Sequence, residues 1–150
     1  NAKVLLSHLP AHIAQRELAV IGEMLRIPSQ HLTYHRDDSA LDPGNCVTVI
    51  LKSEGITEVF TALGKRGLPA EAVARQVVEE VRQYLKSGVP VGRFLADQLL
   101  VPLALTGKGA FVTSSPSLHT TTNMTVISQF TQRPFSQVHL TPTTCRIELT

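Results

Sequence analysis

The apolar positions of the first half recur with two periods, which predict an alternation of strands and helices. The run 69–88 begins with proline and carries an apolar residue at every fourth position, which predicts an amphipathic helix that ends at Gly88. These positions are Val73, Val77, Val81 and Leu85. A second helix is predicted over 13–25, after Pro10. Strands are predicted in short apolar or β-branched runs at 4–8, 31–36, 46–53 and 58–64, and the last two are expected to form a hairpin.

The second half follows a related plan with fewer polar residues. A helix, a strand, a second helix and two closing strands are predicted, in this order, within 91–107, 109–114, 121–130, 134–141 and 143–150. Pro102 is expected to bend or end the first of these helices, which is apolar enough to be nearly buried. In the second helix, Met124, Ile127 and Phe130 are expected to face inward. The two closing strands are expected to form a hairpin or one bent strand.

Charged residues are distributed unevenly, and this distribution divides the chain. Residues 1–86 carry ten basic and ten acidic groups, whereas residues 87–150 carry four and two. We therefore expect the first region to form a self-contained small α/β domain. The second region has few charges with which to solvate a surface of its own. It is expected to pack into a larger sheet that these 150 residues do not complete.

Composition narrows the class of protein. No apolar run approaches the ~20 residues that a membrane-spanning helix needs, so no membrane span is expected. The net charge of +2 provides no polycationic surface, so any contact with nucleic acid must be local. Cys46 and Cys145 lie far apart without paired spacing, which favours reduced thiols in a cytoplasmic protein over a disulfide or a zinc site. The sequence shows no export leader and is expected to be a portion of a longer protein.

His119 is the residue that most strongly indicates chemistry, because it lies in the hydroxyl-rich segment SSPSLHTTTN, 114–123. The segment joins a strand end to a helix start, where backbone N–H groups and the helix dipole can hold an anion. An imidazole facing a phosphate can act as a general acid, or as a nucleophile when it is neutral and a partner orients its second nitrogen. A structural histidine that hydrogen-bonds nearby hydroxyls fits the same residues, so both interpretations stay open.

Three further patterns are weaker indications of a site. His31 and His35 have the spacing of a metal-binding pair on a helix, but their segment is predicted to be a strand and has no third ligand nearby. The loop 64–67, GKRG, precedes a helix as a phosphate-binding loop does, yet it lacks the glycine spacing of such loops. Asp97 and Gln98 lie in an apolar helix, where a carboxylate is either exposed, paired or used in a site.

Three stretches together resemble one protein family: VGRFLADQLLVPLAL, KGAFVTSSPSLHTTTN and GKRGLPAEAVARQV. In order and spacing, essentially the whole chain is similar to the C-terminal portion of the RNA 3'-terminal phosphate cyclase family, although Lys65 stands where an acidic residue is expected. The resemblance implies an α/β (α+β) fold in which 1–86 is an inserted small domain. It implies that 87–150 is the last α/β repeat of a larger domain resembling the C-terminal fold of a translation initiation factor, with the N-terminal part of that domain absent from this chain.

The resemblance also implies an activity, the ATP-dependent conversion of an RNA 3'-phosphate end to a 2',3'-cyclic phosphate. His119 matches the family's nucleophile, which attacks the α-phosphorus of ATP and carries AMP before the RNA receives it. The matching nucleotide-binding stretch consists of Phe94, Leu95, Ala96, Asp97 and Gln98. Mg²⁺ or Mn²⁺ would accompany ATP, with metal ligands expected in the N-terminal portion of the same enzyme, which is also the expected partner of this chain in the cytoplasm.

Two other classes of function compete with this interpretation. One is a non-catalytic ribosome-assembly relative of the same fold that has lost the nucleophile, and the presence of His119 argues against it. The other is a generic phosphopeptide-binding or nucleotide-binding α/β module, which would form no covalent adduct with ATP.

Overall fold

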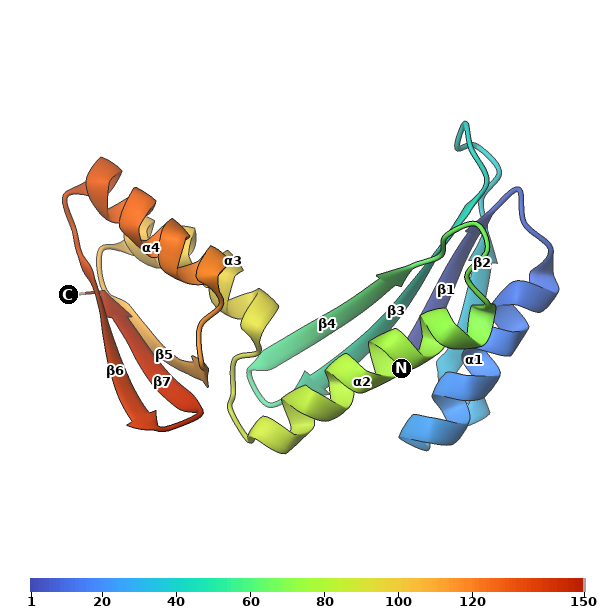
Figure 1. Ribbon diagram of the computed structural model, residues 1–150, viewed down its shortest axis with the longest axis horizontal. Helices are drawn as coiled ribbons and strands as arrows, with labels where there is room; N and C mark the ends of the chain where they lie inside the picture. The colour runs from blue at the N-terminus through green and yellow to red at the C-terminus, as the bar shows by residue number, and fades with distance from the viewer. Residues whose placement is uncertain (150) are drawn as a thin grey trace. The chain divides into compact units, whose positions relative to one another are not determined.

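The computed structural model describes residues 1–149, which separate into two compact units, one from Asn1 to Gln83 and one from Tyr84 onward. Each unit has its own sheet and its own packed helices (Figure 1). The fold class is therefore mixed α/β, as predicted. Separate folding of residues 1–86, however, stays a prediction.

The first unit is built on a four-stranded sheet with strand order β2-β1-β3-β4. Its elements in chain order are β1 (Ala2–Ser7), α1 (Ala11–Leu25), a 3-10 turn (Ser29–His31), β2 (Leu32–Arg36), β3 (Gly44–Ser53), β4 (Ile56–Leu63) and α2 (Ala70–Ser87), the last of which continues past Gln83. Strands β1 and β2 pair in parallel, and the other pairs are antiparallel. The predicted hairpin between β3 and β4 is confirmed, and both helices lie on one face of the sheet (Figure 1).

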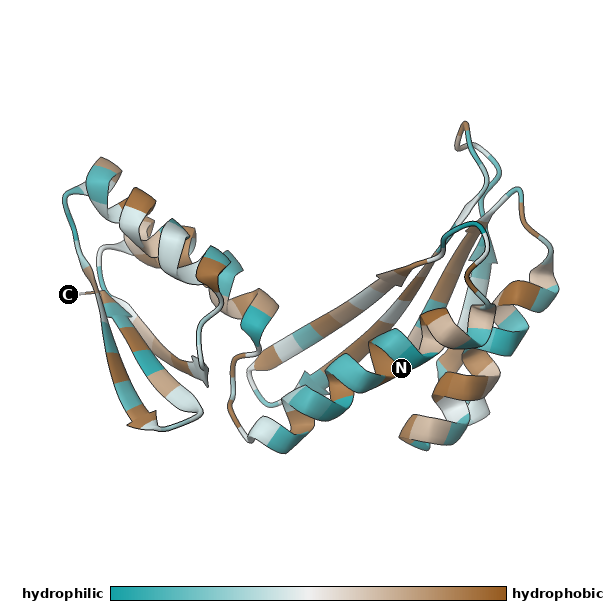
Figure 2. Cartoon of the chain, in the orientation of Figure 1, coloured by the Kyte–Doolittle hydropathy of each residue, from teal (hydrophilic) through white to brown (hydrophobic). Residues whose placement is uncertain are grey.

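The core of the first unit follows from the alternation of side chains along the strands. Val4 pairs with Val47, which pairs with Ala62, and all three side chains are buried. Burial also alternates along β4, where Glu58, Phe60 and Ala62 are buried, but the hydropathy bands of β4 in Figure 2 do not follow this alternation, since the exposed side of the strand carries Val59 and Leu63. Helix α2 buries three of its four predicted apolar positions. The fourth, Leu85, is 59% exposed, and it lies beyond Gln83, where the first unit ends.

The second unit packs two helices against a three-stranded antiparallel sheet with strand order β5-β7-β6. Its elements are α3 (Arg93–Thr106), β5 (Gly109–Ser114), α4 (Leu118–Thr131), β6 (Phe135–Thr141) and β7 (Thr144–Leu149). The closing strands form the predicted hairpin rather than one bent strand. The core consists of Leu100, Met124, Cys145 and Ile147, with Phe111, Ile127 and Phe135 packed against it.

Helix α3 differs from its prediction in two respects. It does not end at Pro102, which is exposed, but continues to Thr106; the other predicted outcome, a bend at Pro102, stays a prediction. The helix is also not nearly buried, since Val101 and Leu105 are exposed. A helix that packs on a single three-stranded sheet buries only the stripe that faces the sheet and the neighbouring helix.

Helix α4 begins three residues earlier than predicted, at Leu118, because the Ser117 hydroxyl caps it. Met124 is buried and Ile127 is half-buried, as predicted. Phe130 is 85% exposed, so its inward orientation was wrong. Phe130 comes six residues after Met124, which is not a multiple of the helical turn of about 3.6 residues. Its side chain therefore points away from the sheet.

Two predictions from composition are also addressed by the structure. Within residues 1–149, no helix has both the length and the apolar character needed to cross a bilayer. Both cysteines are free thiols and both lie in strands, Cys46 in β3 and Cys145 in β7.

Candidate active site

The start of helix α4 forms a capped turn that fixes the position of His119. The Ser117 Oγ accepts a hydrogen bond from the Thr120 N–H at 3.1 Å, and the Thr120 hydroxyl lies 3.0 Å from the same oxygen. Thr120 itself is buried, which anchors the turn to the unit. His119 therefore lies in the first turn of α4, where backbone N–H groups have no acceptor within the helix. An anion beside the imidazole would find these donors and the positive end of the helix dipole.

The imidazole of His119 is held by a side chain from the other helix. Its Nδ1 lies 3.1 Å from Oδ2 of Asp97 in α3. The second carboxylate oxygen, Asp97 Oδ1, accepts a hydrogen bond of 2.7 Å from Nδ2 of Asn123, one turn after His119 on α4. The side chain of Asp97 is 25% exposed, whereas that of His119 is 75% exposed. The carboxylate is thus fixed between an imidazole and an amide, and the rest of the ring faces solvent.

This arrangement selects one tautomer of neutral His119. Asp97 is an acceptor, so Nδ1 must carry the hydrogen for a bond to form at 3.1 Å. Asn123 Nδ2 lies 3.3 Å from His119 Nδ1, but both atoms are then donors and form no hydrogen bond with each other. The Asn123 amide instead donates its hydrogen bond to Asp97. With Nδ1 protonated, the lone pair of the neutral ring is on Nε2. A carboxylate that holds one nitrogen and leaves the other basic is the arrangement that nucleophilic and general-base histidines use.

The remaining residues of the predicted nucleotide-binding stretch lie on α3 in different environments. Phe94 is 42% exposed, and the guanidinium of Arg93 lies 4.4 Å from its ring centroid. Gln98 is exposed, one residue after Asp97. Leu95 is half-buried and Ala96 is buried, so these two side chains are placed for packing within the unit. Asp97 and Gln98 follow Phe94 by three and four residues, so each of them is a neighbour of Phe94 on the helix surface.

Asn123 is a site residue that was not predicted from the sequence. Its signal was present, because His119 and Asn123 are four residues apart and therefore share a helix face. The lone carboxylate of Asp97 in an apolar helix also required a partner. What the sequence did not reveal was that α3 and α4 pack side by side and bring the two signals together.

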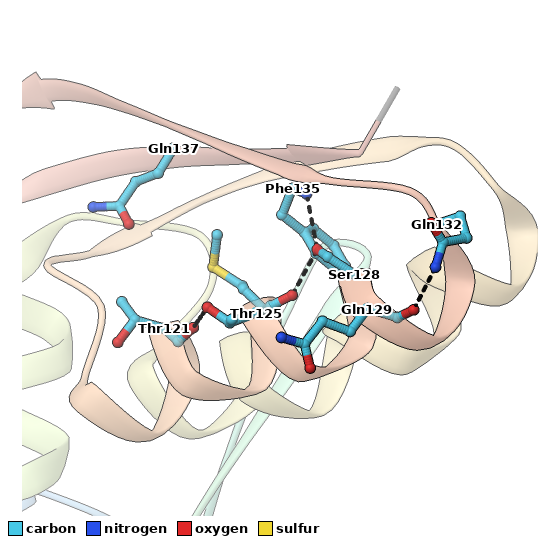
Figure 3. Close-up of a pocket in the computed structure, with 8 residues that line it drawn as sticks. Thr121, Thr125, Ser128, Gln129, Gln132, Phe135 and Gln137 are labelled. Atoms are coloured by element: carbon cyan, nitrogen blue, oxygen red, sulfur yellow. Dashed lines mark hydrogen bonds between the residues drawn. The ribbon is translucent and has the colours of Figure 1, made fainter.

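A groove on another side of α4 is separate from this site. It has a volume of about 690 Å³ between α4 and β6 and is lined by Thr121, Met124, Thr125, Ser128, Gln129, Gln132, Phe135 and Gln137 (Figure 3). Its lining begins two residues after His119, which is about 200° around the helix. The hydroxyls of Thr125 and Ser128 donate to carbonyls of the preceding turn. The groove therefore offers mainly amide groups and carries no titratable side chain.

The weaker candidates from the sequence do not assemble into a metal site. His35 lies on strand β2, as predicted, whereas His31 ends the 3-10 turn before it, so the strand begins one residue later than predicted. Within residues 1–149, no group of three or more His, Cys, Asp or Glu side chains could hold a metal ion. The GKRG loop lies between β4 and α2, with Lys65 and Arg66 exposed and Gly67 at a positive φ of 82°.

Comparisons with known proteins place these features in a wider context. The family model for the insert domain of RNA 3'-terminal phosphate cyclase (RTC) matches residues 2–86. An RNA 3'-terminal phosphate cyclase from Ectopseudomonas mendocina (strain ymp) is 42% identical over 130 residues, which cover 87% of this chain and 38% of that relative. The chain thus spans less than half the length of the curated relative that it matches. A stretch of 130 residues in a chain of 150 necessarily includes the segment from Phe94 to Asn123.

Proposed function

Because the chain belongs to the RNA 3'-terminal phosphate cyclase family, we propose that it contributes the nucleotide-transfer histidine of an enzyme that converts RNA 3'-phosphate ends to 2',3'-cyclic phosphates with ATP. The observation that carries the proposal is the pairing of Asp97 with Nδ1 of an otherwise exposed His119. A passive binding module has no need to hold an imidazole in one tautomer. A group-transfer site needs a nucleophilic nitrogen that is both oriented and accessible.

In the proposed first step, Nε2 of His119 attacks the α-phosphorus of ATP. The bond from this phosphorus to the bridging oxygen breaks, pyrophosphate leaves, and AMP remains on the ring as a phosphoramidate. Asp97 stabilises the positive charge that develops on the imidazole, because its carboxylate accepts a hydrogen bond from Nδ1–H. Asn123 keeps that carboxylate in place through its 2.7 Å hydrogen bond, so it is a positioning residue. The backbone N–H groups at the start of α4 face the developing charge on the phosphate oxygens.

In the second and third steps, the RNA end displaces the histidine and then closes on itself. An oxygen of the RNA 3'-phosphate attacks the AMP phosphorus and the bond to Nε2 breaks, which regenerates the neutral imidazole. The adjacent ribose 2'-hydroxyl then attacks the activated 3'-phosphorus, loses its proton and expels AMP, which forms the cyclic phosphate. Ring closure is intramolecular, so it gains from proximity and needs no further nucleophile.

Nucleotide binding is assigned to the exposed side chains of α3. We assign adenine stacking to Phe94, which is partly exposed, and hydrogen bonding to Gln98. The proposed Mg²⁺ or Mn²⁺ would shield the charge of the ATP phosphates. The described residues provide no metal cluster, so no step is assigned to a metal ligand of this chain.

The test is an RNA cyclisation assay with the natural polypeptide that contains these residues. A 3'-phosphorylated oligoribonucleotide should acquire resistance to phosphatase in the presence of ATP and not in its absence. His119→Asn should abolish the conversion. Thr122→Ala, which changes an exposed neighbour on the same turn, should leave it intact. RNA binding without conversion in the unaltered protein would instead support the non-catalytic assembly-factor function.

A further inference from the structure

The first unit contains a cavity that the proposed chemistry does not use. It has a volume of about 630 Å³, within the range of small-molecule sites. Its walls come from the start of α1, the segment 42–45 that leads into β3, the GKRG loop and the first residues of α2. All of these residues precede Gln83, so the cavity belongs to the first unit alone.

A buried carboxyl group lines this cavity. Glu17 of α1 has no exposed surface, and its Oε1 accepts a hydrogen bond of 2.5 Å from Asn45 Nδ2. Its other oxygen, Oε2, has no hydrogen-bond partner among the described residues. Buried polar atoms in folded proteins are almost always paired, so an unpaired carboxyl oxygen in the wall of a cavity indicates a missing ligand group. An N–H donor would pair with this oxygen when the carboxyl is ionised, and a ligand group with both a donor and an acceptor would pair with either protonation state.

The surroundings hold this carboxyl group in place. The backbone oxygen of Asn45 accepts a hydrogen bond from the Gly64 N–H at 3.0 Å, and the side chain of Asn45 occupies the space where any Cβ at position 64 would lie. Glycine at the first position of the GKRG loop is therefore required for Asn45 to reach Glu17. The position of the loop and the position of the buried carboxyl thus depend on each other.

The rim of the cavity carries the opposite charge. Arg16 forms two hydrogen bonds with Glu71, of 2.6 and 2.7 Å, so its charge is neutralised within the unit. Lys65 and Arg66 are exposed and form no ion pair with any residue of the described chain, and Asp42 is the one acidic rim residue without such a partner. The rim is therefore net positive, while the interior presents a carboxyl oxygen without a partner. A phosphate ion that filled the cavity would lie against the carboxyl of Glu17, which disfavours it. A metal ion would find too few ligands among the described residues.

We propose that this cavity binds one nucleotide unit of a single-stranded RNA, with an N–H group of the base bonded to Glu17 and the phosphate held by Lys65 and Arg66. A nucleotide combines an inner hydrogen-bond donor and an outer anion, which is the polarity of this cavity. Leu9, Ile13 and Leu68 provide apolar contacts for the faces of the base. The choice of RNA over a free nucleotide rests on the proposed function. An acidic phosphopeptide is the main competing ligand.

The test measures binding of a fluorescein-labelled single-stranded RNA octamer of mixed sequence to the full 150-residue chain by anisotropy. The paired change Lys65→Ala and Arg66→Ala should weaken binding about tenfold, because two phosphate contacts are lost. The matched pair Lys3→Ala and Lys52→Ala removes the same charge from exposed positions outside the cavity and should change binding less than twofold. Equal losses from both pairs would mean general electrostatic attraction and would overturn the proposal.

Further arms test the base contact and the source of the ligand. Glu17→Gln should weaken binding by about fivefold, because an acceptor oxygen is exchanged for a donor. Amide NMR shifts on adding RNA should concentrate at residues 12–17, 42–45 and 64–70, and shifts confined to other positions would contradict the assignment. Tighter binding of a nucleoside monophosphate or of a phosphoserine peptide than of the octamer would overturn the RNA assignment. His119→Asn should not alter this binding. The binding result therefore tests the cavity separately from the nucleotide-transfer proposal, and either can fail without the other.

Discussion

Replacing Glu17 by glutamine should stabilise the first unit at neutral pH, and the size of the effect follows from the burial of this carboxyl group. Burial raises the pKa of Glu17 from 4.5 to about 7, against the opposing effects of the Asn45 hydrogen bond and the charge of Arg16. Between these two pH values the folded state retains a proton that the unfolded state has lost. The free energy of unfolding therefore falls as pH rises from about 4.5 to about 7, and the contribution is constant at higher pH.

The loss of folding free energy equals the difference between the two pKa values multiplied by about 1.4 kcal/mol for each pH unit, which gives about 3 kcal/mol. Glutamine cannot ionise, and its oxygen can still accept the hydrogen bond from Asn45. Glu17→Gln should therefore match the unaltered protein near pH 4.5 and exceed its stability by up to about 3 kcal/mol at pH 8.

Urea denaturation of the full chain at several pH values measures this difference. Amide NMR signals of β1 and β3 would report the first unit without contribution from the second. Glu23→Gln, which replaces an exposed glutamate on the same helix, is the matched control for the chemical change itself. A Glu17→Gln difference that is flat with pH, or that grows toward acid pH, would refute the reasoning.

Three further predictions concern separate parts of the chain. The Arg16 hydrogen bonds lower the pKa of Glu71 to about 2, so Glu71→Gln should destabilise the chain at pH 7 and match it near pH 2, because this stabilisation is lost as pH falls from 4.5 through 2; a constant deficit in urea denaturation would contradict it. Phe94→Ala should weaken ATP binding to the natural polypeptide by about 1–3 kcal/mol in calorimetry, and an unchanged dissociation constant would remove Phe94 from the site. A polypeptide of residues 1–86 alone should give dispersed amide NMR signals, and a collapsed spectrum would count against this domain boundary.

The fold was predictable where local pattern and packing agree. The spacing of Val73, Val77 and Val81 predicted the buried stripe of α2, and the β-branched run before Glu54 predicted the β3–β4 hairpin. The predictions failed where burial depends on how much neighbouring structure is present. The apolar composition of α3 predicted a nearly buried helix, but a three-stranded sheet covers only one stripe of it. Phe130 is exposed because its position, six residues after Met124, turns it away from the sheet.

The candidate site was predictable in its parts and not in its assembly. The hydroxyl-rich turn singled out His119, and the isolated carboxylate singled out Asp97, but these residues are 22 positions apart in sequence. Only the packing of α3 beside α4 brings them to 3.1 Å and recruits Asn123. The cavity around Glu17 was harder still to predict, because the sequence shows an ordinary glutamate on an amphipathic helix. Its burial depends on Asn45 and on the closeness of the GKRG loop.

The proposed function depends on covalent attachment of AMP to His119, and labelling with α-³²P ATP detects this attachment. The natural polypeptide that contains these residues is incubated with labelled ATP and MgCl₂, and the labelled peptide is identified by mass spectrometry. We expect a label on His119 that acid removes and alkali does not, as is typical of a phosphoramidate, with no label in His119→Asn and full label in Thr122→Ala. A label that persists in His119→Asn, or that resists acid and maps to Ser117 or Thr120, would contradict the assignment of His119 as the nucleophile.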